Sequence, residues 1–150
     1  VDPYGLASPN GPWIVGSFAL WKYLKEVCNT DIAWTYDDID YVVNTEEQGN
    51  QLLNFFRQTG EPETVLYEGI YKFNKAQVNI KLYEDIRFRL HVHDIDVCQV
   101  GTDNKNFYLS KSAYNSIQNN QCKVTGLTFN QQRTNQRIQK YTERGFVLQP

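Results

Sequence analysis

The chain has 150 residues, of which 41% are hydrophobic and 21% are charged, a composition typical of one globular domain and not of a disordered chain. The net charge of −2 at pH 7 excludes a strongly basic nucleic-acid coat, so a polyanionic partner has to meet a local basic patch. No stretch approaches the ~18 apolar residues of a membrane span, and residues 1–12 show no signal-peptide pattern. The three cysteines are far apart and odd in number, which favours a reducing compartment such as the cytoplasm.

The first part of the chain predicts a strand–helix–strand–helix unit. Residues 1–12 carry three prolines and two glycines and predict an irregular segment, followed by one domain over residues 13–150. Residues 13–15 predict a short buried strand, which Gly16 and Ser17 end, with Ser17 as the N-cap of a helix. The apolar face of that helix follows at steps of three and four residues: Phe18, Trp21, Leu24 and Cys28.

A second strand and a second helix follow. Residues 38–44 predict a strand that turns Ile39, Tyr41 and Val43 to one face. Thr45 and Gln48 predict a capping box at the start of the next helix. The apolar stripe of that helix consists of Leu52, Leu53 and Phe56. The helix is predicted to end at Gly60 and Pro62.

The rest of the chain predicts a strand meander and then two helices. Glu68 and Gly69 predict a hairpin turn between two short strands, and alternation over residues 77–82 predicts a half-buried strand. Residues 85–89 stay undecided between helix and strand. Two further strands are predicted at residues 91–100 and 106–109, and two helices at residues 110–119 and 130–144. The pattern predicts an α+β fold in which a mixed β-sheet is flanked by helices within a single domain.

Two aspartates on the second predicted strand are the most informative feature. Side chains two apart on a strand point to the same face, so Asp38 and Asp40 lie side by side, opposite Ile39 and Tyr41. Two neighbouring carboxylates raise each other's pKa, and a divalent cation removes that cost. Hard carboxylate oxygens suit Mg²⁺ or Mn²⁺.

A second acidic pair and a small-residue turn favour the same site. Asp94 and Asp96 are two apart on the strand predicted at residues 91–100, so three or four carboxylates converge if the two strands are neighbours. Gly16 and Ser17 let a phosphate approach the backbone amides at a helix start. Each part alone is common, but Gly-Ser, helix, Asp-x-Asp and a later strand aspartate in this order are specific.

This order resembles the nucleotidyltransferase superfamily, which has the DNA polymerase β-like fold. Val15-Gly16-Ser17 and Asp38-Ile39-Asp40-Tyr41 fill the places of its signature. More closely, the chain is similar to small nucleotidyltransferase-like proteins of phages and large DNA viruses. The stretches that carry this second resemblance are residues 16–24, Trp34 with residues 38–40, residues 93–100, Arg137 with Ile138, Lys140 with Tyr141, and residues 144–146.

The resemblance implies a metal-dependent transfer of a nucleoside monophosphate from a nucleoside triphosphate to an acceptor hydroxyl, with release of pyrophosphate. Asp38, Asp40 and Asp94 are then the catalytic carboxylates and ligands of Mg²⁺ or Mn²⁺, with Asp96 as a further candidate ligand. Gly16 and Ser17 touch the triphosphate. The acceptor stays open among a nucleic-acid end, a small molecule and a protein. Two alternatives stay open as well: an inactive nucleotide-binding module on the same fold, and an interaction protein whose acidic cluster binds no metal.

Basic residues form a stripe on the last predicted helix, at Arg133, Arg137, Lys140 and Arg144. They are either a phosphate or nucleic-acid contact, with Arg137 and Lys140 as nucleotide-binding candidates, or a solvated face. His91 and His93 lie two apart on the face opposite the second acidic pair, a spacing that could bind a transition metal, but no third ligand is evident and they are interpreted as surface or packing residues. Asp37 is predicted to point away from Asp38 and is left out of the site.

Overall fold

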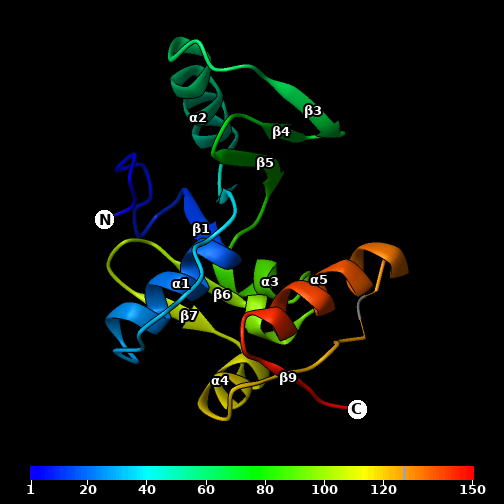
Figure 1. Ribbon diagram of the computed structural model, residues 1–150. Helices are drawn as coiled ribbons and strands as arrows, with labels where there is room; N and C mark the ends of the chain where they lie inside the picture. Colours follow the sequence, from blue (N-terminus) through cyan, green and yellow to red (C-terminus); the bar gives the residue numbers. More distant parts are fainter. Residues whose placement is uncertain (127) are drawn as a thin grey trace.

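A mixed seven-stranded β-sheet runs through the computed structural model, which describes residues 1–126 and 128–150. Its strands are β1 (Trp13–Val15), β2 (Ile39–Val43), β3 (Thr64–Tyr67), β4 (Ile70–Lys72), β5 (Ala76–Leu82), β6 (Val100–Thr102) and β7 (Phe107–Leu109). Their spatial order is β3-β4-β5-β2-β1-β6-β7. β2 and β5 pair in parallel, and the other pairs are antiparallel (Figure 1).

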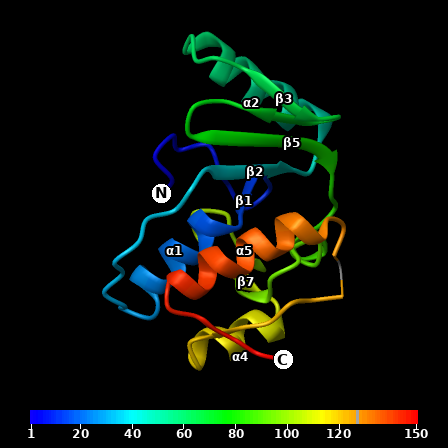
Figure 2. The same ribbon diagram turned by 45° about the vertical axis from the view of Figure 1, so that its right-hand side comes forward.

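Helices flank this sheet. They are α1 (Ser17–Glu26), α2 (Glu46–Gln58), α3 (Ile86–Leu90), α4 (Lys111–Gln118) and α5 (Gln131–Glu143). A 3₁₀ turn η1 (Asp96–Cys98) and a small parallel pair, β8 (Gln121–Cys122) with β9 (Val147–Leu148), complete the described elements. Figures 1 and 2 both place α2 and the β3–β4 hairpin at one end of the molecule and α4 at the other. Within the described residues, no helix combines the length and the apolar character that a membrane crossing needs.

The predicted α+β class is confirmed, together with most of the predicted elements. The capping box is present, because Thr45 Oγ1 accepts from the Gln48 amide while the Gln48 side chain accepts from the Thr45 amide. The hairpin forms with β3 and β4 on either side of Glu68 and Gly69. Residues 85–89, left undecided by the sequence, start the short helix α3, which Asp85 caps by accepting from the Arg87 amide.

Strand alternation decides which side chains meet on each face of the sheet. In β2, Ile39, Tyr41 and Val43 pack in one core cluster with apolar residues of α2, as the sequence predicted. Val42 points to the other face and packs in a second cluster with residues of α3. Asp40 shares the face of Val42, because the two are two residues apart on the strand. The fold therefore brings α3 to the face that carries Asp40.

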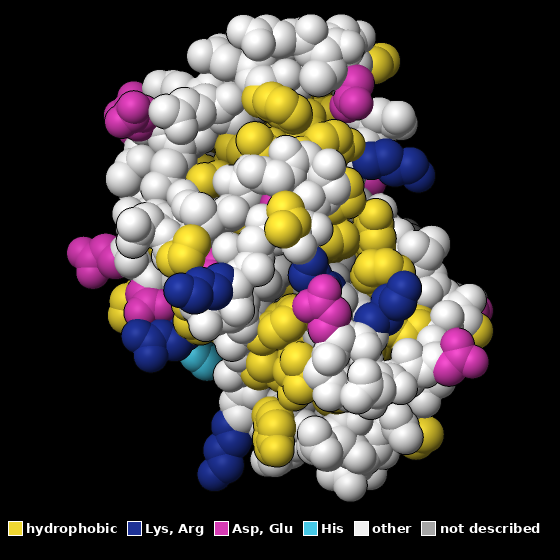
Figure 3. Space-filling view, turned by 90° about the vertical axis from the view of Figure 1, so that its left-hand side faces the viewer, with side chains coloured by type: hydrophobic (Ala, Val, Ile, Leu, Met, Phe, Trp, Pro, Cys, Tyr) yellow, Lys and Arg dark blue, Asp and Glu magenta, His cyan; other side chains and the backbone are white. Residues whose placement is uncertain are grey.

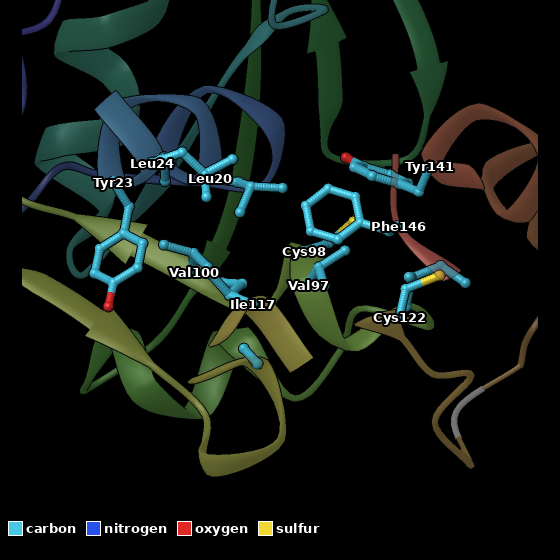
Figure 4. Close-up of a cluster of buried hydrophobic side chains, with 13 residues drawn as sticks. Leu20, Tyr23, Leu24, Val97, Cys98, Val100, Ile117, Cys122, Tyr141 and Phe146 are labelled. Carbon is cyan, nitrogen blue, oxygen red and sulfur yellow. The ribbon is translucent and has the colours of Figure 1, made fainter. Parts of the chain in front are cut away.

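A third core cluster joins α5 to the rest of the domain. Buried side chains of α1, η1, β6, α4 and α5 meet in it, and Figure 4 shows Tyr141 and Phe146 beside Val97 and Cys98. Cys98 and Cys122 are buried here, and all three cysteines are free. Since Tyr141 is 3% exposed, α5 is held in place by apolar packing and can present its other faces to a site.

Residues 1–12 form neither a helix nor a strand, but they are packed against the sheet. Asp2 is buried, and its carboxylate accepts from Tyr41 Oη at 2.6 Å and from Asn104 Nδ2 at 2.6 Å. Backbone amides within the same segment also donate to this carboxylate. These hydrogen bonds hold the pKa of Asp2 below its usual value, although burial alone raises it.

The prediction of one strand over residues 91–100 is wrong. The chain there makes a turn, a single bridge between Ile95 and Val124, and the turn η1 before β6 begins at Val100. The aspartates in this stretch accept hydrogen bonds from other elements, so the backbone follows local turns and not a sheet ladder. Asp94 and Asp96 therefore do not share a strand face.

Candidate active site

A cleft of about 490 Å³ opens where the start of α1, the start of β2 and one face of α5 meet. The structure brings seven of the eight predicted site residues to this cleft, all except Asp96: Gly16, Ser17, Asp38, Asp40, Asp94, Arg137 and Lys140. Four aspartates and four Lys or Arg side chains face the cleft, so its chemistry depends on how these charges pair. Elsewhere, on the face shown in Figure 3, basic side chains are dispersed among acidic ones.

Asp40 is the most exceptional side chain of the cleft. It lies in the centre of the sheet, opposite Val15 of β1 and Gln77 of β5. Its Oδ1 atom is buried and has no hydrogen-bond partner in the described part of the chain. Burial, and then the negative charge of Asp38, raise the pKa of Asp40 to about 7. A buried carboxylate without a donor is costly, so this oxygen is arranged for a partner that the chain itself does not supply.

The pair of aspartates fits a hard divalent cation. Asp38 precedes β2, and its carboxylate forms an ion pair with Lys72 of β4. A cation beside both carboxylates satisfies the open oxygen of Asp40 and removes the repulsion between the two charges. No group of three or more carboxylate, imidazole or thiolate side chains within residues 1–126 and 128–150 is placed to hold a metal. The role of Asp38 and Asp40 as metal ligands therefore stays a prediction, which the open oxygen of Asp40 supports.

Gly16 is what lets Asp40 approach the start of α1. A Cβ atom on residue 16 would lie 3.1 Å from Asp40 Oδ2, and the residue has φ of +84° and ψ of −143°. Glycine alone adopts such a conformation at little cost. The prediction that Ser17 is the N-cap is wrong by one residue, because Gly16 occupies that position. No side chain caps α1, so its first amides are oriented to accept an anion.

Ser17 instead connects α1 to the segment before β2. Its hydroxyl accepts a hydrogen bond from the Asp37 amide at 3.2 Å. Ser17 and Gly16 both line the cleft, as predicted. Contact of these residues with a triphosphate remains a prediction.

Asp94 lies in the same cleft but is engaged by cationic and hydroxyl donors. Its Oδ2 atom accepts from Thr134 Oγ1 at 2.5 Å and from Arg137 Nη1 at 2.5 Å. Both donors belong to α5, so Asp94 links that helix to the cleft floor. The structure therefore brings Asp94 to the site of Asp38 and Asp40, yet holds its carboxylate in an ion pair. Its predicted role as the third metal ligand stays a prediction.

Asp96 is placed outside the cleft, contrary to the prediction that it shares a face with Asp94. The side chain is fully buried, and its Oδ2 atom accepts from Ser112 Oγ at 2.6 Å and from Ser116 Oγ at 2.5 Å. Its Oδ1 atom accepts from the Lys123 amide at 2.8 Å. Asp96 thus ties α4 to η1 and has its acceptor sites occupied, which suits a structural carboxylate.

Asp96→Asn is expected to lower the free energy of unfolding by roughly 1.5–3 kcal/mol, because it removes charge-assisted hydrogen bonds inside the protein. Affinity for Mn²⁺ should stay within about twofold of the original protein, since the side chain does not face the cleft. Urea unfolding and Mn²⁺ titration followed by electron paramagnetic resonance measure the two quantities. A variant that keeps its stability and loses Mn²⁺ would show that Asp96 is a ligand.

The predicted basic residues lie on α5 and at its C-terminal end, and three of the four form ion pairs with aspartates. Arg137 pairs with Asp94, while Lys140 and Arg144 both pair with Asp37 at 2.9 Å. Arg137 and Lys140 line the cleft as nucleotide-binding candidates, whereas Arg144 does not. Arg133 makes no ion pair among the described residues and lies over the Tyr67 ring, 5.0 Å from its centre.

Asp37 is a cleft residue that the sequence analysis left out. Burial raises its pKa, but the hydrogen bond from Lys140 and the charge of Arg144 outweigh this and hold the pKa below its usual value. It was placed on the opposite face by strand alternation. β2 begins at Ile39, so the alternation does not extend back to Asp37.

Arg89 and His93 are two further cleft residues that the sequence analysis did not assign to the site. Arg89 Nη1 lies 3.1 Å from His93 Nε2, and both side chains line the cleft beside Asp40. Burial, and then the charges of Arg89 and Arg137, hold the pKa of His93 well below its usual value. His93 is therefore neutral at pH 7 and accepts the hydrogen bond from Arg89. His91 is exposed, so the two histidines do not form a metal-binding pair.

Comparison with solved structures identifies the fold. A CCA-adding enzyme of Thermotoga maritima complexed with tRNA matches with a TM-score of 0.60 and 15% identity, over 92% of this chain and 35% of that one. A CCA-adding enzyme of Bacillus stearothermophilus in complex with CTP matches with a TM-score of 0.55 and 11% identity, over 92% and 36%. A tRNA-processing enzyme with CTP matches with a TM-score of 0.58 and 15% identity, over 91% and 39%.

These enzymes belong to the nucleotidyltransferase superfamily, so the chain has the fold that the resemblance implied. The chain spans well under half the length of each of them. No model of a known protein family matches it, and no curated protein sequence does. The closer similarity to phage and viral proteins stays a prediction.

Proposed function

We propose that the protein transfers a nucleoside monophosphate from a nucleoside triphosphate to an acceptor hydroxyl, in a reaction that depends on Mg²⁺ or Mn²⁺. The observation that carries this proposal is the buried, unpartnered oxygen of Asp40 beside the uncapped start of α1. A carboxylate that needs a cation and a helix start that suits a phosphate meet in one cleft. The shared fold with nucleotide-adding enzymes supports the same reaction class.

Each residue then has a defined part in the reaction. Asp38 and Asp40 would hold the metal ions, which would supply positive charge to the triphosphate and to the attacking oxygen. The first amides of α1 donate hydrogen bonds to the phosphate oxygens, and Gly16 keeps the approach open. The acceptor oxygen forms a bond to the α-phosphorus, the bond to the pyrophosphate oxygen breaks, and the hydroxyl proton passes to solvent. Arg137 and Lys140 lie along the cleft wall, where they can contact the nucleotide.

A nucleic-acid end is the acceptor that the cleft mouth supports best. Tyr67 and Phe129 line the cleft and are 51% and 81% exposed. The Phe129 ring can therefore stack on a base, whereas one face of the Tyr67 ring is covered by Arg133. Arg133, which has no acidic partner among the described residues, also lines the cleft and can meet a phosphate. The structural neighbour complexed with tRNA supports the same class of acceptor.

The free thiols of the three cysteines support a reducing, cytoplasmic location.

A second candidate is a nucleotide-binding module that transfers nothing. The ion pair between Asp94 and Arg137 favours it, because it occupies the carboxylate that the resemblance implies as the third metal ligand. Such a module keeps the nucleotide cleft and lacks the metal geometry for chemistry.

The experiment that tests these proposals incubates the protein with α-labelled nucleoside triphosphates, Mg²⁺ or Mn²⁺, and a panel of acceptors. The panel contains RNA, single-stranded DNA, small hydroxyl compounds and protein. Label on a nucleic-acid end, with release of pyrophosphate in equal amount, is the expected result. Binding of nucleotide without pyrophosphate release supports the second candidate instead. Absence of both binding and transfer contradicts both.

A further inference from the structure

We infer that Arg89, held by His93, is the residue that binds the phosphate groups which leave as pyrophosphate. This inference rests on the proposed function, since it assigns one side chain to part of the same nucleotide. Arg89 is not part of the sequence pattern that predicted the site. Its assignment depends on where α3 places its guanidinium group.

The guanidinium of Arg89 lies in the cleft without an acidic partner bonded to it. Its Nε atom is buried and makes no hydrogen bond with any described residue. The group influences Asp40 electrostatically, yet neither side chain is bonded to the other. Two opposite charges thus face one space, each with an unused hydrogen-bonding atom. A phosphate group of a nucleotide would satisfy both, because its oxygens would accept from the arginine while Asp40 would help to hold the metal ion that accompanies the nucleotide.

His93 fixes the position of this guanidinium. The neutral ring accepts from Arg89 Nη1 at 3.1 Å, and its Cε1 atom lies 3.7 Å from where a Cβ on Gly16 would be. The ring therefore fills the space between Arg89 and the start of α1. Arg89 is thus separated from the start of α1 by one imidazole ring, and both line the same cleft, so an extended polyphosphate could reach the guanidinium and the first amides of α1 together.

The alternatives for Arg89 are weaker. Its remaining neighbour is Tyr83, whose ring centre lies 6.0 Å from the guanidinium carbon, at the limit of a cation–π contact. Arg87, on the same helix, forms an ion pair with Asp85, with an Nη2 to Oδ2 distance of 2.5 Å. An arginine that only stabilised the fold would be expected to have a partner of that kind, because burial of an unpaired charge is costly.

Binding of pyrophosphate in the presence of Mg²⁺, measured by isothermal titration calorimetry, tests the inference. Arg89→Met is expected to weaken binding by roughly 10- to 100-fold, since hydrogen bonds to a charged group contribute about 1.5–3 kcal/mol. Arg89→Lys keeps the positive charge but lacks the paired donors of the planar guanidinium, so a smaller loss of pyrophosphate affinity is expected. Arg87→Met is the matched control, with the same change on the same helix at an exposed ion pair, and it should stay within about twofold.

Two further readouts separate this role from others. Mn²⁺ affinity of Arg89→Met should be unchanged or increased, because a positive charge near Asp40 is removed; a parallel loss of Mn²⁺ would show that Arg89 only supports the carboxylate. Undiminished pyrophosphate binding by folded Arg89→Met and Arg89→Lys overturns the inference, even if the original protein transfers nucleotides. Pyrophosphate binding that depends on Arg89 in a protein that transfers nothing keeps the assignment of Arg89 to the outer phosphates of a bound nucleotide and overturns the proposed transfer.

Discussion

Asp40→Asn is expected to reduce nucleotide transfer by roughly a thousandfold or more while the protein stays folded. A bound metal contributes several kcal/mol of transition-state stabilisation, and each 1.4 kcal/mol changes a rate tenfold. The amide keeps the shape of the side chain but cannot serve as a charged ligand for Mg²⁺. Label transfer and Mn²⁺ titration measure the effect. Asp31→Asn makes the same chemical change at an exposed position and should leave both unchanged.

The same substitution also has a predicted effect on stability in the absence of metal. The pKa of Asp40 is about 7 in the folded protein, above the value of about 3.9 expected in the unfolded chain. Between these values the folded state binds more protons, so the free energy of unfolding falls as pH rises from about 4 to about 7. The contribution of Asp40 to this fall is about 4 kcal/mol at most.

Urea unfolding in EDTA at pH 5 and pH 8 measures this pH dependence. Asp40→Asn should be more stable than the original protein at pH 8 and should lose the fall that Asp40 causes. Addition of Mg²⁺ at pH 8 should stabilise the original protein and not the variant, because only the carboxylate binds it. A fully active Asp40→Asn protein, or one with the original pH profile, would falsify the assignment of Asp40.

The face of Asp40 was predictable from the sequence because strand alternation is a local property. Ile39, Tyr41 and Val43 take alternate positions of β2 and pack in the core, which leaves Asp40 on the opposite face. Asp38 lies one residue before β2, so alternation does not fix its direction, although it lines the same cleft as Asp40. Thr45 and Gln48 fixed the start of α2 for the same reason, since a capping box needs only four consecutive positions. Such signals do not depend on what the rest of the chain does.

Long-range partners were not predictable in this way. The aspartates at 94 and 96 are spaced like strand residues, but Thr134, Arg137 and two serines of α4 are their actual partners. These contacts cross up to 43 positions of sequence, and they override the local alternation. Arg89 was not predicted as a site residue because α3 has only five residues, too few for a helical period to be recognised.

Gly16→Ala is expected to cost about 1–3 kcal/mol of stability and to weaken Mn²⁺ and nucleotide binding by about tenfold or more. The stability loss comes from the backbone, because φ of +84° with ψ of −143° is a conformation for glycine. The binding loss comes from the added methyl group, which would lie 3.1 Å from Asp40 Oδ2 and would displace the carboxylate. Urea unfolding and Mn²⁺ titration measure the two losses independently.

Gly60→Ala separates these two effects. Gly60 also has a positive φ, of +75°, but a Cβ there meets nothing within 4 Å. Its alanine variant should therefore lose stability through backbone strain and keep Mn²⁺ affinity, nucleotide binding and transfer. If both variants kept Mn²⁺ affinity equally, the close approach of Gly16 to Asp40 would have no part in metal binding. If only Gly16→Ala loses it, the glycine is required because it gives the Asp40 carboxylate room beside the start of α1.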